Sequence, residues 1–207
     1  MIKLEHKSVH GWEPAIYGAR NPMNSWKNCD SYEDWPEHPG VYKIGPNDHK
    51  LLMRLAKAGS DHRKWMRMVT VYVDITAPLY WWKEFDTYKV GTVANSCSTM
   101  HKIHDKHFEL ADFSYDHLLD KGVGVMRDVI RALNMYRDLY LEDKDKVWWQ
   151  QMIQLLPSSY NQKRTVMLNY EVLRNMYHAR KNHKLEEWHE FCDWIKKLPY
   201  SEFITEK

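Results

Sequence analysis

Three polar residues near the C-terminus have the types and the spacing to recognise a flat heterocycle. Asn169, Asn175 and Arg180 follow one another at steps of six and five residues. On a helix, Asn169 and Arg180 would lie about three full turns apart and share a face. A carboxamide donates and accepts hydrogen bonds, and a guanidinium offers a planar fork of donors. This face either brackets a planar ligand or is ordinary polar surface.

An uncharged stretch of small polar residues, 90–100, has the composition of a binding segment. It contains Asn95, Ser96, Cys97, Ser98 and Thr99. Hydroxyls and backbone amides at a helix start can hold a phosphate, and a plain helix cap is the alternative. Cys97 could act as a nucleophile only beside a base or a helix N-terminus. Without such a neighbour, we expect a buried and inert thiol.

A histidine cluster follows this stretch. His101 and His104, three residues apart on a helix, could share a metal ion, with Asp105 or His107 as a further ligand. The lysines interspersed among them repel a cation. We therefore predict a solvated helix face and no bound metal.

The elements that must position these residues indicate an α+β domain. Apolar residues alternate over 68–76 and predict a half-buried strand, which Ala77-Pro78 ends because proline cannot donate to the sheet. A short strand is also expected at 164–168. Helical spacing predicts helices over 48–58, 79–86, 171–181 and 185–198, and longer apolar stripes beginning at Val125 and Val147. Residues 21–48 have the Asn, Pro, Gly, Asp and Ser content of an irregular segment.

Composition excludes several classes of protein. The 207 residues suit one domain, 1–207, with a core of its own. Thirty Lys and Arg against 28 Asp and Glu leave a net charge of +2, which argues against nucleic-acid or membrane binding, and the basic group at 63–67 is expected to be an exposed face. Three cysteines at unrelated spacings predict neither disulfides nor zinc. With no signal peptide or apolar span, we expect a cytoplasmic protein.

Taken together, these segments resemble the flavin-dependent thymidylate synthase family (ThyX), at distant similarity. The resemblance begins at Ala77-Pro78 and runs to His101. Over this stretch the family has an aromatic helix followed by Arg-His-Arg, small residues, Ser, Asn-Glu, Ser and Arg-Tyr. It resumes at Leu156-Pro157, with Asn169 twelve residues after Pro157 and with Asn175 and Arg180 at the family's spacings. Residues at the Arg-His-Arg positions are Thr87, Tyr88 and Lys89.

The resemblance implies a ThyX-like fold, a small and mostly antiparallel sheet flanked by helices with a long-helix C-terminal half, and a homotetramer. It implies methylation of dUMP to dTMP, or a related pyrimidine C5 modification, with FAD, methylenetetrahydrofolate and NADPH. Arg180 would be catalytic and would polarise the uracil ring. The cofactor-binding residues would be Thr87, Tyr88, Lys89, Asn95, Asn169 and Asn175. The substrate-binding residues would be Glu84, Ser96, Cys97, Ser98, Thr99 and Arg180.

This sequence departs from the family pattern where the family carries charge. Ser96 replaces a Glu, Met100-His101 replaces Arg-Tyr, and Ile153 replaces an Arg before Leu-Pro. Each missing charged contact to a phosphate costs about 1.5–3 kcal/mol. The departures favour one alternative, a catalytically diverged relative that keeps the fold for nucleotide or partner binding.

Overall fold

The computed structural model describes all of residues 1–207. The chain divides into two compact structural units. Each unit gathers segments that lie far apart in the sequence. Unit 1 contains Met1–Leu4, Asp74–Thr87 and Ala94–Thr165. Unit 2 contains Glu5–Val73, Tyr88–Val93 and Val166–Lys207.

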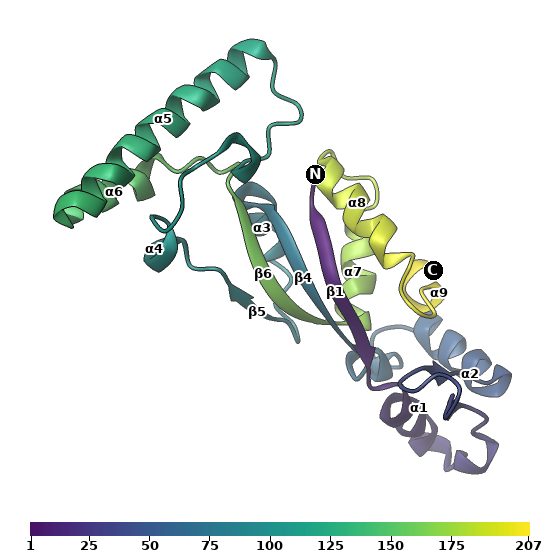
Figure 1. Ribbon diagram of the computed structural model, residues 1–207. Helices are drawn as coiled ribbons and strands as arrows, with labels where there is room; N and C mark the ends of the chain where they lie inside the picture. Colours follow the sequence, from purple (N-terminus) through teal and green to yellow (C-terminus); the bar gives the residue numbers. More distant parts are fainter. The chain divides into compact units, whose positions relative to one another are not determined.

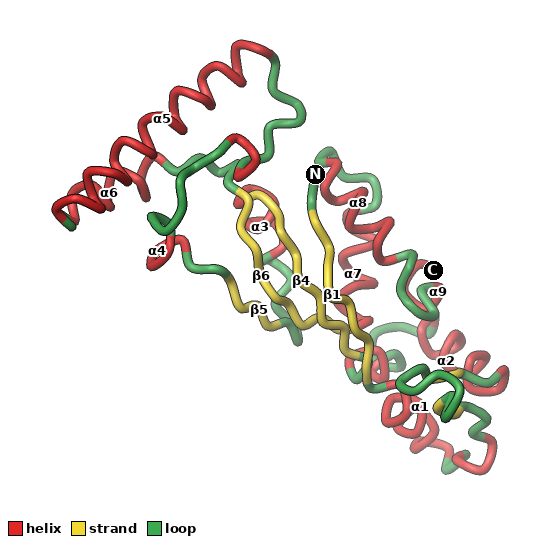
Figure 2. Tube along the Cα trace, in the orientation of Figure 1, coloured by secondary structure: helices red, strands yellow, loops and turns green.

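A small antiparallel sheet flanked by helices is the centre of the fold, which confirms the expected fold class. Its four strands have the order β1-β4-β6-β5, and each strand contributes residues to both units. Figures 1 and 2 show these strands within the chain. Their bounds are β1 Lys3–His10, β4 Thr70–Pro78, β5 Val93–Ser96 and β6 Asn161–Asn169.

Strand β4 shows why the sequence pattern forms an element with one buried face. Val71, Val73 and Ile75 are almost fully buried, while Tyr72 between them is 42% exposed. Because side chains alternate across a strand, this pattern places every second residue in the core. The predicted strand is confirmed, two residues later than expected. Helix α3 (Leu79–Phe85) begins directly after Pro78, also as predicted.

Unit 1 is built around a pair of long helices. Helices α5 (Asp120–Asp143) and α6 (Lys146–Leu155) pack against each other (Figure 1). The apolar core beneath them contains Ile103, Phe108, Phe113, Ile130, Leu133 and Met152. The buried carboxamide of Asn134 accepts a hydrogen bond from Phe108 N (2.8 Å) and donates to Phe108 O (2.9 Å). The unit also contains α4 (Thr99–Lys102) and the 3-10 turn η4 (Leu110–Asp112).

The predicted apolar stripe on α5 is buried in only part of the helix. Leu133 is fully buried, whereas Val125 is 63% exposed. The helix therefore begins well before the core that covers its later turns.

Unit 2 has an aromatic core. Trp12 meets Tyr170 and Tyr200 edge-on, with ring centroids 5.0 and 5.3 Å apart. Its helices are α1 Trp12–Arg20, α2 Pro46–Lys57, α7 Tyr170–Arg180, α8 Glu186–Ile195 and α9 Glu202–Thr205. Its shorter elements are η1 Asn21–Met23, η2 Trp26–Asn28, the paired strands β2 Tyr32–Glu33 and β3 Tyr42–Lys43, and η3 Lys64–Arg67.

Helices α2, α7 and α8 confirm the predictions made from spacing. The predicted stripe of α8 is half-buried at Leu185 and buried from there on, at Trp188, Phe191, Cys192, Ile195 and, just after the helix, Leu198. The sequence did not predict β1, because its eight residues include only two apolar ones, Leu4 and Val9, and these do not alternate with polar residues.

The irregular segment between α1 and α2 is fixed by a buried ion pair. Asp48 is fully buried, and Arg20 Nε donates to its Oδ1 at 2.6 Å. Its Oδ2 accepts hydrogen bonds from the backbone of Asp30 (2.9 Å) and Ser31 (3.0 Å). Burial alone would raise the pKa of Asp48, but hydrogen bonds from Ser31, Asp30 and Arg20 outweigh burial and lower it. Asp48 is thus held ionised as the anchor of this segment.

None of the helices combines the length and the apolar character needed to cross a bilayer.

Candidate functional site

Arg180, the last residue of α7, lies against two aromatic rings of unit 2. Its Nε donates a hydrogen bond to the hydroxyl of Tyr88 at 2.9 Å. The guanidinium carbon lies 5.0 Å from the ring centroid of Trp188 and 5.6 Å from that of Tyr88. Cation–π contact with two rings restricts the rotamers of an otherwise flexible side chain. The structure therefore orients this cation before any ligand arrives.

Asn169 ties the loop after Tyr88 to the start of α7. It is the N-cap of the helix, and its Oδ1 accepts from Val172 N at 2.9 Å. Its Nδ2 donates to the carbonyl oxygen of Gly91 at 3.3 Å. Gly91 has a φ of +70°, and a Cβ there would lie 2.5 Å from that Nδ2. Glycine is required because only it allows both the backbone turn and the close approach.

The position of Asn169 differs from the expectation that it shares a helix face with Arg180. It precedes the helix and is only 4% exposed, so its carboxamide is used inside the protein. Asn175 lies on α7 and is exposed, as is Lys89 in the loop. Unit 2 thus brings together Tyr88, Asn169 and Arg180 around one loop and one helix.

The remaining predicted site residues belong to unit 1. The side chain of Thr87 is exposed, and its Oγ1 donates to the carbonyl oxygen of Glu84 at 2.7 Å. Asn95 and Ser96 are exposed on β5. Cys97 N donates to Lys163 O (2.9 Å), and Gln162 Nε2 donates to Cys97 O (2.9 Å), so backbone contacts hold this segment.

The helix-cap interpretation of the small-residue stretch is confirmed. Ser98 is the N-cap of α4, and its Oγ accepts from His101 N at 3.0 Å. Thr99 is the first residue of that helix. With only four residues, α4 presents little dipole to an anion.

The expectation of a buried thiol at Cys97 is wrong, since Cys97 is exposed. Cys97 directly follows β5, which lies at an edge of the sheet and whose residues are all exposed. The buried cysteine is Cys192 on α8, and burial raises the pKa of its thiol to about 11. Cys192 therefore stays protonated at neutral pH.

The residues of the histidine cluster have other partners than a metal ion. His104 packs edge-on against Tyr140 with ring centroids 4.8 Å apart. The carboxylate of Asp105 pairs with Lys102 Nζ at 2.9 Å. His101 is exposed on α4, whereas His104 is half-buried and lies after the helix, so the predicted solvated helix face holds only in part.

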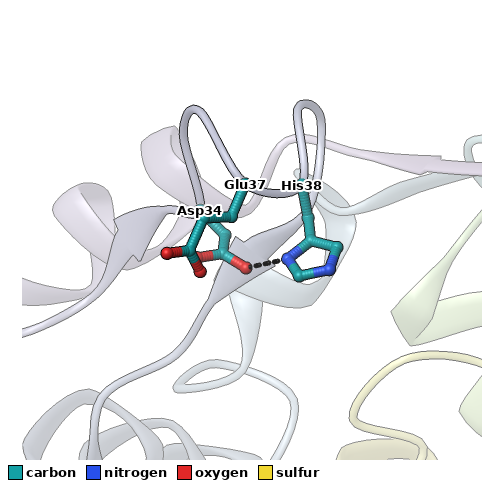
Figure 3. Close-up of side chains that lie close together, drawn as sticks. All are labelled: Asp34, Glu37 and His38. Atoms are coloured by element: carbon teal, nitrogen blue, oxygen red, sulfur yellow. Dashed lines mark hydrogen bonds and ion pairs between the residues drawn. The ribbon is translucent and has the colours of Figure 1, made fainter.

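A different group of possible metal ligands lies in the β2–β3 connection. Asp34, Glu37 and His38 place one ligand atom each within 4.8 Å of one another, and Figure 3 shows their close approach. Asp34 Oδ2, however, already contacts Lys43 Nζ at 2.9 Å and His38 Nδ1 at 2.7 Å. The hydrogen bond from Lys43, with one from His38, lowers the pKa of Asp34. The lysine ammonium takes the place that a cation would need.

Sequence reasoning missed Trp188 as a site residue. Its place in the α8 stripe marks it as core, and it is fully buried. Its contact with Arg180 depends on the turn between α7 and α8, where His183 N donates to Arg180 O at 2.9 Å. No spacing rule predicts the direction of that turn.

Searches against protein-family models and against curated proteins found no match. Solved structures do match. Thymidylate synthase X (ThyX) from Helicobacter pylori with FAD and dUMP aligns with a TM-score of 0.69 and 17% identity, over 99% of this chain and 97% of that one. A second complex of that enzyme with FAD and dUMP gives 0.67 and 17%, over 99% and 96%.

A UMP/dUMP methylase, PolB from Streptomyces cacaoi, bound with 5-Br dUMP, is also similar. It has a TM-score of 0.61 and 14% identity, over 99% of this chain and 94% of that one. The chain therefore has a ThyX-like fold along almost its whole length.

Proposed function

We propose that this protein is a flavin-dependent enzyme that methylates dUMP to dTMP or performs a related C5 modification of a pyrimidine nucleotide. Two similar structures hold FAD with dUMP, and a third is a UMP/dUMP methylase. The observation that carries the proposal is the oriented guanidinium of Arg180. It lies at the spacing from Asn169 that the family resemblance requires.

Arg180 provides the electrostatic part of the proposed chemistry. Attack through C5 of uracil gives the ring carbanion character, and the negative charge spreads onto the ring oxygens. A guanidinium fixed beside those oxygens stabilises that charge more than it stabilises neutral substrate. Tyr88 and Trp188 orient the guanidinium in advance, which reduces the reorganisation needed during the reaction.

The residues of unit 2 fit a flavin in part. Lys89 is an exposed cation for a phosphate, and Asn175 is an exposed carboxamide for a polar edge of the ring. Asn169 is already hydrogen-bonded at both ends, so its role would be to hold the loop of residues 88–92 in place. When bound, FAD would supply the redox chemistry that carries two electrons from NADPH to the one-carbon unit.

The overall reaction balances with the proposed co-substrates. The methylene group of methylenetetrahydrofolate forms a bond to C5 of dUMP, and its two bonds to folate nitrogens break. The C5 proton is lost, and the two folate nitrogens are protonated, which consumes one further proton from solvent overall. NADPH supplies the hydride that reduces the methylene group to methyl, and tetrahydrofolate and NADP⁺ are released. The protein's own contribution is to bind the pyrimidine, polarise it at Arg180 and keep the reactants together.

We further propose a homotetramer, the assembly that the family resemblance implies. Large apolar side chains on α5 and just before it are exposed: Leu119 at 84%, Val125 at 63% and Met135 at 50%. Exposed apolar residues on one long helix are typical of an association surface. Sedimentation velocity of the purified protein measures the assembly directly, and a monomer at micromolar concentration would refute it.

The test combines a colour and a growth phenotype. The purified protein should carry or take up FAD and show flavin visible absorbance. It should also support growth of a thymidine-requiring strain without thymidine. Arg180→Ala should abolish growth and reduce dUMP turnover by about 100-fold, the usual effect of removing such a donor. Arg54→Ala, an exposed arginine on α2 of the same unit, is the matched control and should behave as wild type.

A second candidate is a nucleotide-binding protein without synthase activity. It is favoured by the internal use of Asn169 and by the replacement of Arg-His-Arg with Thr87-Tyr88-Lys89. This candidate predicts dUMP binding that depends on Arg180, with neither FAD uptake nor growth. Flavin-dependent turnover would exclude it.

A further inference from the structure

A cavity of about 310 Å³ lies in unit 1 where α4 approaches the turn between α5 and α6. None of its residues was among the predicted site residues. The residues that line it are Met100, His101, His104, Tyr140, Lys144, Lys146 and Trp149. It lies within one unit, so its geometry does not depend on the placement of the other.

The lining has an unusual balance of charge. Two lysines and two histidines face the cavity, and no carboxylate does. Two other cavities on unit 1 differ in this respect. One of about 530 Å³ mixes Arg131 with Asp138 and Glu142, and one of about 480 Å³ mixes Arg127 and Arg131 with Asp128. The cation-lined cavity therefore suits an anion better than either neighbour.

One of its cations, Lys144, is held near an aromatic ring. Lys144 ends α5 in the left-handed conformation (φ +60°), and its Nζ lies 5.3 Å from the ring centroid of Tyr140. Trp149 forms another wall and donates its Nε1 to Met100 O at 3.0 Å. Histidine and lysine nitrogens are donors that bind phosphate oxygens. His104 has a buried Nδ1 without a hydrogen-bond partner, and its Nε2 lies 3.6 Å from Asp105 Oδ1.

The nearby acidic residues differ in their partners. Asp105 pairs with Lys102, and Asp145 caps α6 by accepting from Val147 N at 2.9 Å. Asp143 accepts from Trp148 Nε1 at 3.0 Å, and its pKa is lowered by hydrogen bonds from Asp145 N and from Trp148. Asp143 and Asp145 therefore have partners outside the cavity, whereas Asp105 also contacts His104 in its lining.

We infer that this cavity is a binding site for a phosphate group, with Lys144 and Lys146 as its cations and His101 and His104 as further donors. Met100 and His101 belong to α4, directly after the segment proposed to hold the nucleotide phosphate. That the phosphate belongs to dUMP rests on the proposed function, whereas phosphate binding by the cavity does not.

Calorimetric titration with three probes tests the site on the full-length protein. The probes are dUMP, deoxyuridine and inorganic phosphate. The double variant K144Q/K146Q should bind dUMP about tenfold more weakly, as expected for the loss of charged hydrogen bonds at an exposed site. Its affinity for deoxyuridine, which carries no phosphate, should not change.

Lys121→Gln is the matched control, because it removes an exposed lysine from α5 outside the cavity. It should bind all three probes as wild type does. Both altered lysines are exposed, so the circular dichroism and melting temperature of the double variant should match wild type.

The outcomes separate the cavity from the proposed function. If wild type binds inorganic phosphate but not dUMP, and the double variant loses phosphate, the cavity is a phosphate site and the proposed function fails. Unchanged dUMP affinity in the double variant overturns the inference while the proposed function stands. Failure of wild type to bind either dUMP or inorganic phosphate overturns both.

Discussion

The two polar segments that the sequence marks as parts of one site, residues 95–99 and 169–180, are held in place by different forces. In the C-terminal segment, Arg180 lies against Tyr88 and the buried ring of Trp188. In the other, Asn95, Ser96 and Cys97 are exposed, and the segment is fixed through backbone hydrogen bonds to β6.

The guanidinium of Arg180 is therefore preorganised, whereas the segment of residues 95–99 is adaptable. A guanidinium restrained by two rings loses little conformational entropy when a ligand binds. The exposed side chains of Asn95 and Ser96 have no such restraint from neighbouring rings. The cavity lined by Lys144 and Lys146 lies beside this adaptable segment, where extra cations are most useful.

The largest expected effect is on stability, from the ring behind Arg180. Trp188→Ala should lower the free energy of unfolding by about 3–5 kcal/mol, because the side chain is fully buried and leaves a cavity. Urea unfolding measures this. Trp35→Ala is the control, since that ring is 69% exposed and its loss should change the free energy by about 0.5 kcal/mol or less. Equal effects would mean that the ring of Trp188 contributes no packing.

The two asparagines of the C-terminal segment should separate structure from binding. Asn169→Ala should cost about 2 kcal/mol, because it removes a helix cap and a buried contact with Gly91. Asn175→Ala should leave stability unchanged and weaken FAD retention, since Asn175 is exposed. Thermal melts and flavin absorbance measure the two effects. A stable Asn169→Ala variant that has lost FAD would reverse these roles.

Removing one hydroxyl should disturb the orientation of Arg180 without disturbing the fold. Tyr88→Phe keeps the ring but loses the acceptor for Arg180 Nε. We expect the rate of dUMP turnover to fall about tenfold while stability is unchanged. A tenfold fall is a typical effect of losing one hydrogen bond to a charged group. Tyr72→Phe, at a 42% exposed position on β4, serves as the control. Wild-type turnover in Tyr88→Phe would show that the rings alone orient the guanidinium.

The smallest effect belongs to the adaptable segment. Ser98→Ala removes the cap of a four-residue helix and should cost about 0.5–1 kcal/mol of local stability. Faster hydrogen exchange at the His101 amide would reveal the loss, with the global melting temperature unchanged. Ser98→Thr retains a capping hydroxyl and should exchange as wild type. A cooperative loss of fold in Ser98→Ala would contradict the adaptable description.

Much of the fold was predictable because it follows from local periodicity. The alternation over β4 and the stripe on α8 each mark a single buried face, and burial of that face is the largest stabilising term. The sequence could not predict β1, whose lysines and histidines lack an apolar period. It also misjudged Cys97, because exposure depends on which neighbouring elements cover a segment.

The sequence alone determined most of the helices, the strand β4, the ThyX-like α+β class and the residue types available for a pyrimidine nucleotide. Only the tertiary structure decided that Asn169 caps α7, that Trp188 meets Arg180 and that Lys144 and Lys146 share a cavity with two histidines. The physical reason is the separation along the chain of the residues that make contact. Periodicity reports which face of an element is buried, whereas these contacts depend on the direction of turns and on residues brought together from distant parts of the chain.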